Sequence, residues 1–297
     1  IREVAPSRGL GDVYKRQVYN NFFNSIRNNG RNVVENELLY DGKEYRVDWE
    51  KLEQQLADPQ TTLMILCNPQ NPAGNIWDRE TLARIGALCK QYDVIVVSDE
   101  IHCDLTKPGT EYIPFASVDD TCRDISVTCI APTKTFNLAG LQTAAVYAEN
   151  SILHHRMWRQ LNTDEVAEPN AFAIQATIAA FQYGEEWLDE LREYVEKNKQ
   201  YVTEFLQEKI PLIHPVAGDA TYLMWLDCRK ITESGRQFVK FIRKTSGLYV
   251  SGGNQYGRGG EGFLRVNVAT SKLVVEDGMQ RLYESVDAWL KEEKISK

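Results

Sequence analysis

Short apolar segments alternate with amphipathic segments through residues 45–150, and this alternation constrains the fold more than any other feature of the sequence. Asp48 and Asp78 each precede a segment in which leucine and isoleucine recur at helical spacing, as expected when an aspartate caps a helix. The apolar segments between these helices are short enough to be buried strands, and they cover residues 61–66, 94–98, 125–130 and 143–147. This order of elements predicts a largely parallel α/β sheet.

The second half of the chain shows a different pattern. Helical spacing covers residues 151–161, 171–182 and 185–210, and Pro211 and Pro215 then interrupt it. Strand-like and helix-like segments follow in a shorter stretch, at residues 222–226, 235–244, 248–251, 263–268 and 274–290. We therefore predict an α/β fold with a large domain at residues 18–195, built on a mostly parallel sheet, and a smaller C-terminal α+β domain at residues 196–297.

Composition and charge exclude several classes of partner. The 297 residues include 34 Lys and Arg against 42 Asp and Glu, a net charge of −8, which does not suit nucleic acid or an anionic membrane. No apolar run approaches the roughly 20 residues of a membrane-spanning helix. The six cysteines form no C-x-x-C pair, and the four histidines show no metal-ligand spacing. We expect free thiols in the reducing cytoplasm, and no metal, nucleic-acid or membrane partner.

Polar motifs follow three of the predicted strands. They are Asn68-Pro-Gln-Asn71, Asp99-Glu-Ile-His102 and Pro132-Thr-Lys134. Ligands bind beyond the carboxyl ends of parallel strands, so the three motifs are expected to line one crevice. Each motif alone has an ordinary explanation, because a lysine is usually solvated, an aspartate can cap a helix and Asn-Pro can form a turn. Their succession at three strand ends favours a binding site.

The residue types in these motifs fit pyridoxal 5'-phosphate (PLP). A lysine can form a Schiff base with an aldehyde, and an aspartate can hold a pyridinium N–H. An asparagine amide can bind a phenolic oxygen, and the hydroxyl of Thr133, next to Lys134, can reach a phosphate. Together the motifs predict PLP as the cofactor.

The extended motifs resemble those of the class I/II aminotransferase superfamily of PLP enzymes. They read Asn68-Pro-Gln-Asn-Pro-Ala-Gly74, Ser98-Asp-Glu-Ile-His102 and Pro132-Thr-Lys-Thr-Phe-Asn137. The resemblance runs from about Val18 to the C-terminus and implies the PLP-dependent transferase-like fold, fold type I, and a homodimer. Within the superfamily, the chain is similar to the MalY/PatB branch, the cystathionine β-lyase-like C–S lyases.

Three details indicate this branch. His102 stands where many relatives have Tyr, and Gln142 stands where typical aminotransferases have a phosphate-binding Arg. The segment Thr221-Tyr-Leu-Met-Trp-Leu-Asp227 is similar to a strand of the branch's small domain. Ala131 departs from the family, which usually has Ser there. Gln142 and Ala131 therefore each lack a group with which the family binds the phosphate.

The resemblance implies a role for each residue of the cofactor site. Lys134 binds PLP covalently and later moves the Cα proton of the substrate, and Asp99 pairs with the pyridine nitrogen. These two are the predicted catalytic residues. Asn71 contacts the phenolic oxygen with His102 close by, and Tyr19 stacks on the face of the ring. An ordinary buried tyrosine is the alternative interpretation of Tyr19.

Arg265 matches the arginine that binds the substrate carboxylate in the family. Its local pattern supports this independently, because in Leu264-Arg-Val-Asn-Val268 the polar Arg265 and Asn267 share one strand face. A guanidinium suits a bidentate contact with a carboxylate. An exposed arginine on a strand face is the alternative.

The implied activity is that of a PLP-dependent carbon–sulfur β-lyase, which releases pyruvate, ammonia and a thiol from an amino-acid thioether. Transamination of amino acids uses the same residues and is an alternative, and a non-catalytic regulatory or binding module is an alternative of another class. Gly257-Arg-Gly-Gly-Glu-Gly262 matches a dinucleotide-binding motif but leads into a strand instead of a helix. We therefore interpret residues 252–262 as a mobile loop near the substrate entrance.

The beginning of the chain does not fit the resemblance. Residues 1–17 resemble no part of the family, and we expect them to be a non-native leader. Tyr19 belongs well inside the large domain of the family fold, so about one hundred residues, a domain's worth of chain, are expected to precede it. These would include part of the phosphate site and a tyrosine of the neighbouring subunit. For this chain of 297 residues, we expect weak PLP binding and reduced turnover.

Overall fold

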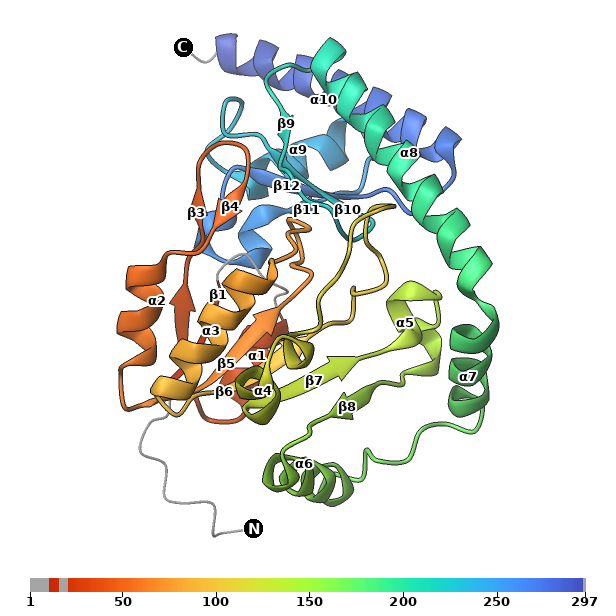
Figure 1. Cartoon of the computed structure of the whole chain (residues 1–297). Helices are drawn as coiled ribbons and strands as arrows, with labels where there is room; N and C mark the ends of the chain where they lie inside the picture. The colour runs from red at the N-terminus through yellow and green to blue at the C-terminus, as the bar shows by residue number, and fades with distance from the viewer. Residues whose placement is uncertain (1–10, 16–20, 296–297) are drawn as a thin grey trace.

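A computed structural model describes residues 11–15 and 21–295 of the chain. Its elements include two larger sheets with helices around each of them, and a two-stranded hairpin (Figure 1). The six-stranded sheet lies in the lower part of the view, and the four-stranded sheet lies above it with the C-terminal helices. No helix among the described residues is long and apolar enough to cross a membrane.

The six-stranded sheet is parallel except at one edge. Its strand order is β2-β1-β5-β6-β7-β8, and only the pair of β7 and β8 is antiparallel. The bounds are β1 (Gly11–Lys15), β2 (Asn32–Asn36), β5 (Thr61–Cys67), β6 (Ile95–Asp99), β7 (Ser126–Ile130) and β8 (Ala145–Tyr147). The prediction of a mostly parallel sheet is therefore confirmed.

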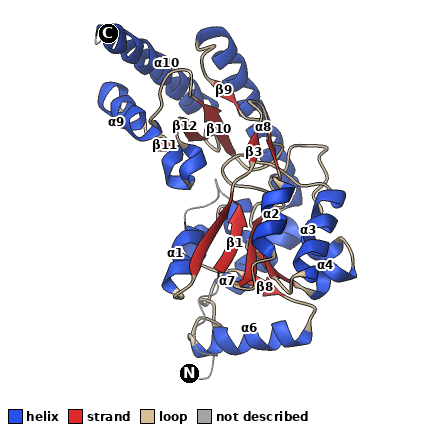
Figure 2. Ribbon diagram, turned by 90° about the vertical axis from the view of Figure 1, so that its left-hand side faces the viewer, coloured by secondary structure: helices blue, strands red, loops and turns tan. Residues whose placement is uncertain are grey.

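Helices cover both faces of this sheet (Figure 2). One face carries α1 (Asn21–Asn28), and the other carries α2 (Trp49–Leu56), α3 (Arg79–Gln91) and α4 (Asp120–Asp124). Successive side chains of β5 point to opposite faces of the sheet: Ile65 packs with Ile26 of α1, while Met64 and Leu66 pack with α2 and α3. The sheet therefore forms the middle of three layers. The predicted helix caps are also present: Asp48 accepts a hydrogen bond from Lys51 N at 3.1 Å, and Asp78 from Thr81 N at 2.7 Å.

The four-stranded sheet is antiparallel and has the order β11-β12-β10-β9. Its strands and helices are β9 (His214–Pro215), β10 (Leu223–Asp227), β11 (Ser251–Gly252), β12 (Phe263–Asn267), α8 (Glu185–Lys209), α9 (Gly235–Ser246) and α10 (Lys272–Ile295). Leu226 and Leu264 face these helices, whereas Trp225 and Phe263 belong to the core cluster of the six-stranded part. The sheet therefore lies between its own helices and the rest of the molecule.

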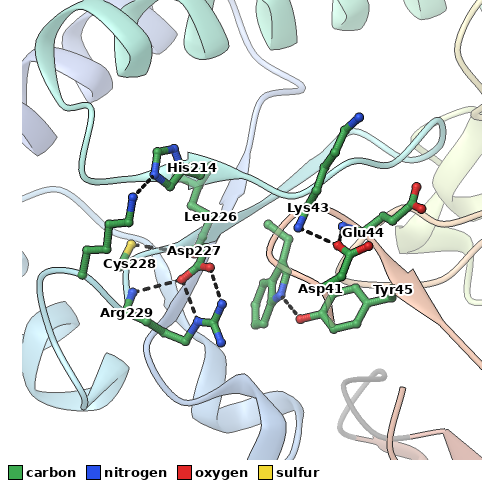
Figure 3. A network of polar contacts seen from close by, with 11 residues as sticks. Asp41, Lys43, Glu44, Tyr45, His214, Leu226, Asp227, Cys228 and Arg229 are labelled. Carbon is green, nitrogen blue, oxygen red and sulfur yellow. Dashed lines mark hydrogen bonds and ion pairs between the residues drawn. The ribbon is translucent and has the colours of Figure 1, made fainter. Parts of the chain in front are cut away.

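A short hairpin joins the two parts. It consists of β3 (Leu39–Tyr40) and β4 (Tyr45–Arg46), and it reaches from the end of β2 toward the four-stranded sheet. The indole Nε1 of Trp225 donates a hydrogen bond of 3.1 Å to the hydroxyl of Tyr45. Figure 3 shows this contact region, with Tyr45 on one side and Asp227 and Arg229 of the β10 end on the other. The Arg229 guanidinium also lies over the ring of Tyr40, 4.8 Å from its centroid.

The remaining helices are α5 (Pro132–Thr135), α6 (Ser151–Thr163) and α7 (Ala173–Tyr183). Of the predicted strand at residues 248–251, only its last residue pairs, as part of β11. Helix α8 passes without interruption through the predicted domain boundary at residue 195, and β1 lies within the predicted leader. The division at residues 1–17, 18–195 and 196–297 stays a prediction.

Candidate active site

The carboxyl ends of β5, β6 and β7 lie side by side at one edge of the sheet. Asp99, the last residue of β6, is in register with Cys67 of β5 and Cys129 of β7. The three polar motifs follow directly after these strands, so they meet at this edge as the strand order requires. The chain after β7 turns into α5, which carries Lys134 (Figure 1).

Asp99 is a largely buried carboxyl close to Lys134. Its Oδ1 accepts a hydrogen bond of 3.2 Å from the backbone N–H of Ile101. Burial raises the pKa of Asp99 above its ordinary value, and the Ile101 N–H and the Lys134 charge offset part of this effect. A cationic N–H donor placed beside Asp99 would stabilise its ionised form further.

His102 is buried, with 3% of its surface exposed. Desolvation, together with the positive charges of Lys134 and Arg265, lowers the pKa of His102 to about 4. Its ring packs edge-to-face against Tyr222 with centroids 6.0 Å apart. Among the described residues, Nδ1 of His102 has no hydrogen-bond partner. The imidazole is thus neutral at pH 7 and keeps one buried ring nitrogen for a ligand.

Lys134 is held by the short turn of α5. Pro132 occupies its first turn, where a missing N–H costs no hydrogen bond, and the hydroxyl of Thr135 donates to Asp104 Oδ2 at 3.0 Å. Thr133 and Lys134 are both half-buried. The segment then turns through Asn137, whose φ of 54° lies in the left-handed region. These contacts fix the backbone on both sides of the lysine.

The two asparagines of the first motif serve different purposes. Asn68 is fully buried and accepts a hydrogen bond from Trp77 N at 3.1 Å, so it holds the loop together. Asn71 instead reaches the site: its Oδ1 accepts a hydrogen bond of 3.0 Å from Nη1 of Arg265. The predicted residue Asn71 is thus joined directly to the predicted residue Arg265.

Arg265 lies on the face of β12 that is turned toward the six-stranded part. Leu264 and Val266, which alternate with it, pack among the helices on the opposite face. The Arg265 guanidinium lies 4.7 Å from the centroid of the Tyr256 ring. No described residue accepts a hydrogen bond from Nε of Arg265, which is buried. The guanidinium therefore has donors left for an anionic ligand.

Tyr256 lies within the glycine-rich segment at residues 252–262, but no sequence motif marks it as a residue of the site. The predicted mobile loop contains two 3-10 turns, η3 (Gly253–Tyr256) and η4 (Arg258–Gly260), and the ring of Tyr256 is 3% exposed. A Cβ on Gly253 would lie 2.1 Å from the carbonyl oxygen of Gly260. This close approach explains the glycines at positions 253 and 260 and shows that the two turns lie tightly against each other.

Among the predicted site residues, the structure brings together Asn71, Asp99, His102, Thr133, Lys134 and Arg265. Tyr19 lies outside the described residues, so its predicted role is not tested. The residues present fit PLP: a buried carboxyl could pair with a pyridinium nitrogen, a lysine could bind the aldehyde, and a neutral histidine has an unpaired nitrogen.

The chain is similar in sequence to known proteins. A family model described as "Aminotransferase class I and II" matches residues 12–282. Cystathionine beta-lyase PatB of Bacillus subtilis is 42% identical over 270 residues, which cover 91% of this chain and 70% of that protein. Protein MalY of Escherichia coli is 31% identical over 281 residues, covering 94% and 71% of the two chains.

Solved structures show the same similarity. Cystalysin from Treponema denticola, which contains PLP, superposes with a TM-score of 0.92 at 29% identity, and the match covers 94% of this chain and 71% of that one. The PLP-bound C–S lyase from Staphylococcus hominis gives a TM-score of 0.87 at 29% identity, with 95% and 73% covered.

Proposed function

The chain belongs to the class I and II aminotransferase family, whose fold and PLP dependence it shares, and we propose that it is a carbon–sulfur β-lyase acting on L-cysteine thioethers such as cystathionine. The observation that carries this proposal is the convergence of Lys134, Asp99 and Arg265 on one site. The 42% identity to a cystathionine beta-lyase, and the fold shared with C–S lyases, support this reaction over other PLP reactions.

Three side chains act on the substrate and the cofactor in this reaction. PLP, when bound, supplies an aldehyde for the substrate amine and a ring that accepts the electrons of the Cα–H bond. Arg265 binds the α-carboxylate of the substrate through its free donors. The Lys134 amine removes the proton from Cα, and the Asp99 carboxylate keeps a proton on the pyridine nitrogen.

Neighbouring residues set the polarity of the site. Asn71 can donate from its amide nitrogen to the phenolic oxygen while its Oδ1 holds Arg265. His102 adds no positive charge at pH 7, because its pKa is about 4. Thr133 supplies a hydroxyl for the phosphate. Cleavage of the Cβ–S bond then releases the thiol, and hydrolysis of the remaining three-carbon fragment gives pyruvate and ammonia.

Incubation with cystathionine tests the reaction. We expect one pyruvate, one ammonia and one homocysteine per cystathionine consumed, with no keto acid added. Lys134→Ala, incubated in parallel, should form none of these products. A strict requirement for an added keto acid, with no pyruvate formed in its absence, would instead identify an aminotransferase.

We further propose that the protein is a homodimer of the cytoplasm. Large apolar side chains are exposed along one side of the molecule, on and around α6 and α7, and include Ile152, Trp158, Phe172, Ile174 and Phe181. Such a patch is unusual on a monomer, and a second copy is the partner expected to cover it. All six cysteines are free thiols, in keeping with a reducing compartment. Light scattering after gel filtration should give twice the chain mass of 33.9 kDa.

A further inference from the structure

The ring of Tyr256 lies against the guanidinium of Arg265. The Cζ atom of Arg265 is 4.7 Å from the ring centroid, and the ring itself is buried. A cation placed over an aromatic ring is attracted by the negative face of that ring, and the attraction is strongest where water is excluded. Tyr256 therefore favours one place for the guanidinium without occupying any of its hydrogen-bond donors.

The Tyr256 ring is in turn held from two directions. Trp225 packs edge-to-face against it, with centroids 5.6 Å apart and planes at 87°. Trp225 is fixed by a parallel stack on Phe263 at 5.1 Å and by its hydrogen bond to Tyr45 of the hairpin. The position of the ring is therefore set by the four-stranded sheet and by a hairpin of the six-stranded part.

Arg265 has a second anchor in Asn71, whose Oδ1 lies 3.0 Å from its Nη1. A guanidinium has five N–H donors, so one bond to Asn71 leaves most of them available. We propose that Tyr256 is a positioning residue for Arg265, and that it sets the preference of the site for ligands that carry a carboxylate. This proposal rests on the proposed role of Arg265 in binding the substrate carboxylate.

The test compares two ligands that differ only at the carboxylate. 3-(Methylthio)propanoate and its amide, 3-(methylthio)propanamide, have no α-amine, so neither can be turned over. Calorimetry on the PLP-loaded enzyme gives the dissociation constant of each ligand. The dissociation constant of the amide divided by that of the carboxylate measures the preference of the site for a carboxylate. We expect Tyr256→Leu to lower this ratio about tenfold, because a ring–cation contact in a desolvated site is lost. Tyr256→Phe keeps the aromatic face and should keep the ratio.

Tyr249 provides a matched control. Arg243 lies over its ring at 4.8 Å, nearly the same contact, but Tyr249 is 75% exposed. Tyr249→Leu should leave the ratio unchanged. Tyr256→Met, which fills the buried space without an aromatic face, replaces Tyr256→Leu if that variant does not fold.

The outcomes separate this inference from the proposed function. If Arg265→Gln abolishes the carboxylate preference while folded Tyr256→Leu or Tyr256→Met retains it, the positioning role of Tyr256 is wrong and the role of Arg265 stands. Equal weakening of both ligands in the Tyr256 variants also overturns the inference, because it indicates a general structural effect. If Arg265→Gln itself leaves the ratio unchanged, the proposed carboxylate site is wrong.

Discussion

Oδ1 of Asn71 accepts a hydrogen bond of 3.0 Å from Nη1 of Arg265, although the two residues are 194 positions apart in the sequence. The bond ties the loop after β5 to β12 of the four-stranded sheet. Its acceptor is a neutral amide, which orients the guanidinium without neutralising it. The positive charge of Arg265 is therefore still available to a substrate carboxylate.

Replacing that neutral acceptor with a charged one should block the site. Asn71→Asp keeps the shape of the side chain but places a carboxylate beside the guanidinium, where it competes with the substrate. Breaking a close charge pair costs about 2–5 kcal/mol, so we expect KM for cystathionine to rise on the order of 100-fold. Initial rates over a range of cystathionine concentrations give this number.

Asn24→Asp is the control for Asn71→Asp, because Asn24 is exposed on α1. It makes the same change of charge away from Arg265 and should leave KM unchanged. An Asn71→Asp enzyme with wild-type KM would show that Asn71 does not influence the carboxylate site.

Lys134→Ala should abolish turnover. The amine that binds the aldehyde and moves the Cα proton is lost, and proton transfer by a positioned base alone accounts for about 10²–10⁴-fold in rate. Pyruvate release measures the rate, and the visible absorption of the bound cofactor should disappear in the same variant. Lys90→Ala, which removes an exposed ion pair with Asp124, should change neither. Retention of the absorption band by Lys134→Ala would move the covalent attachment to another lysine.

Asp99→Asn should stabilise the cofactor-free protein and lower its affinity for PLP. Burial raises the pKa of Asp99, so the native state binds this proton more tightly than the unfolded chain does. The contribution of this proton to folding stability is complete below pH 3.8, the ordinary pKa of an aspartate. It is lost as the pH rises through the higher pKa that Asp99 has in the folded protein. At pH 7 an uncharged asparagine avoids that loss, and we expect a gain of about 0.5–2 kcal/mol in urea unfolding. PLP affinity should fall in the same variant.

The exposed Asp287, paired with Lys291 on α10, provides the comparison for Asp99. Asp287→Asn should leave both the pH 7 stability and PLP affinity within about 0.5 kcal/mol of wild type. A loss of stability in Asp99→Asn would show that, even without the cofactor, the contacts of the Asp99 carboxylate outweigh the cost of burying its charge.

The strand ends of the site could be predicted because each rule involved is local. A run of apolar residues predicts β5 and β6, the aspartates Asp48 and Asp78 cap the helices beside them, and parallel neighbours bring their ends together. The alternation in β12 likewise separated Arg265 from the apolar residues on either side of it. None of these steps requires knowledge of which distant segment packs opposite.

The contacts of Arg265 could not be predicted, because they join elements that are far apart in the chain. Periodicity assigns Arg265 to one face of a strand but does not say that Asn71 and Tyr256 lie opposite that face. The strands β3 and β4 have two residues each, too few to show an alternation, and the hydrogen bond from Trp225 to Tyr45 links the hairpin to β10. The predicted strand at residues 248–251 pairs only at its last residue, and Tyr249 remains exposed.

His102 should make the protein sensitive to acid. Its pKa in the folded state is about 4, against 6.5 for an unperturbed histidine, because burial and the charges of Lys134 and Arg265 oppose protonation. As the pH falls from 6.5 toward 4, His102 is protonated in the unfolded chain but stays neutral in the native state. The free energy of unfolding therefore declines by about 2–3 kcal/mol. His102→Asn removes this loss, so its urea midpoint should fall less between pH 7 and pH 4.5 than the wild-type midpoint does. His154→Asn, a change at an exposed position on α6, should follow the wild-type curve. If His102→Asn also follows the wild-type curve, the imidazole is protonated more easily than its burial beside Lys134 and Arg265 predicts.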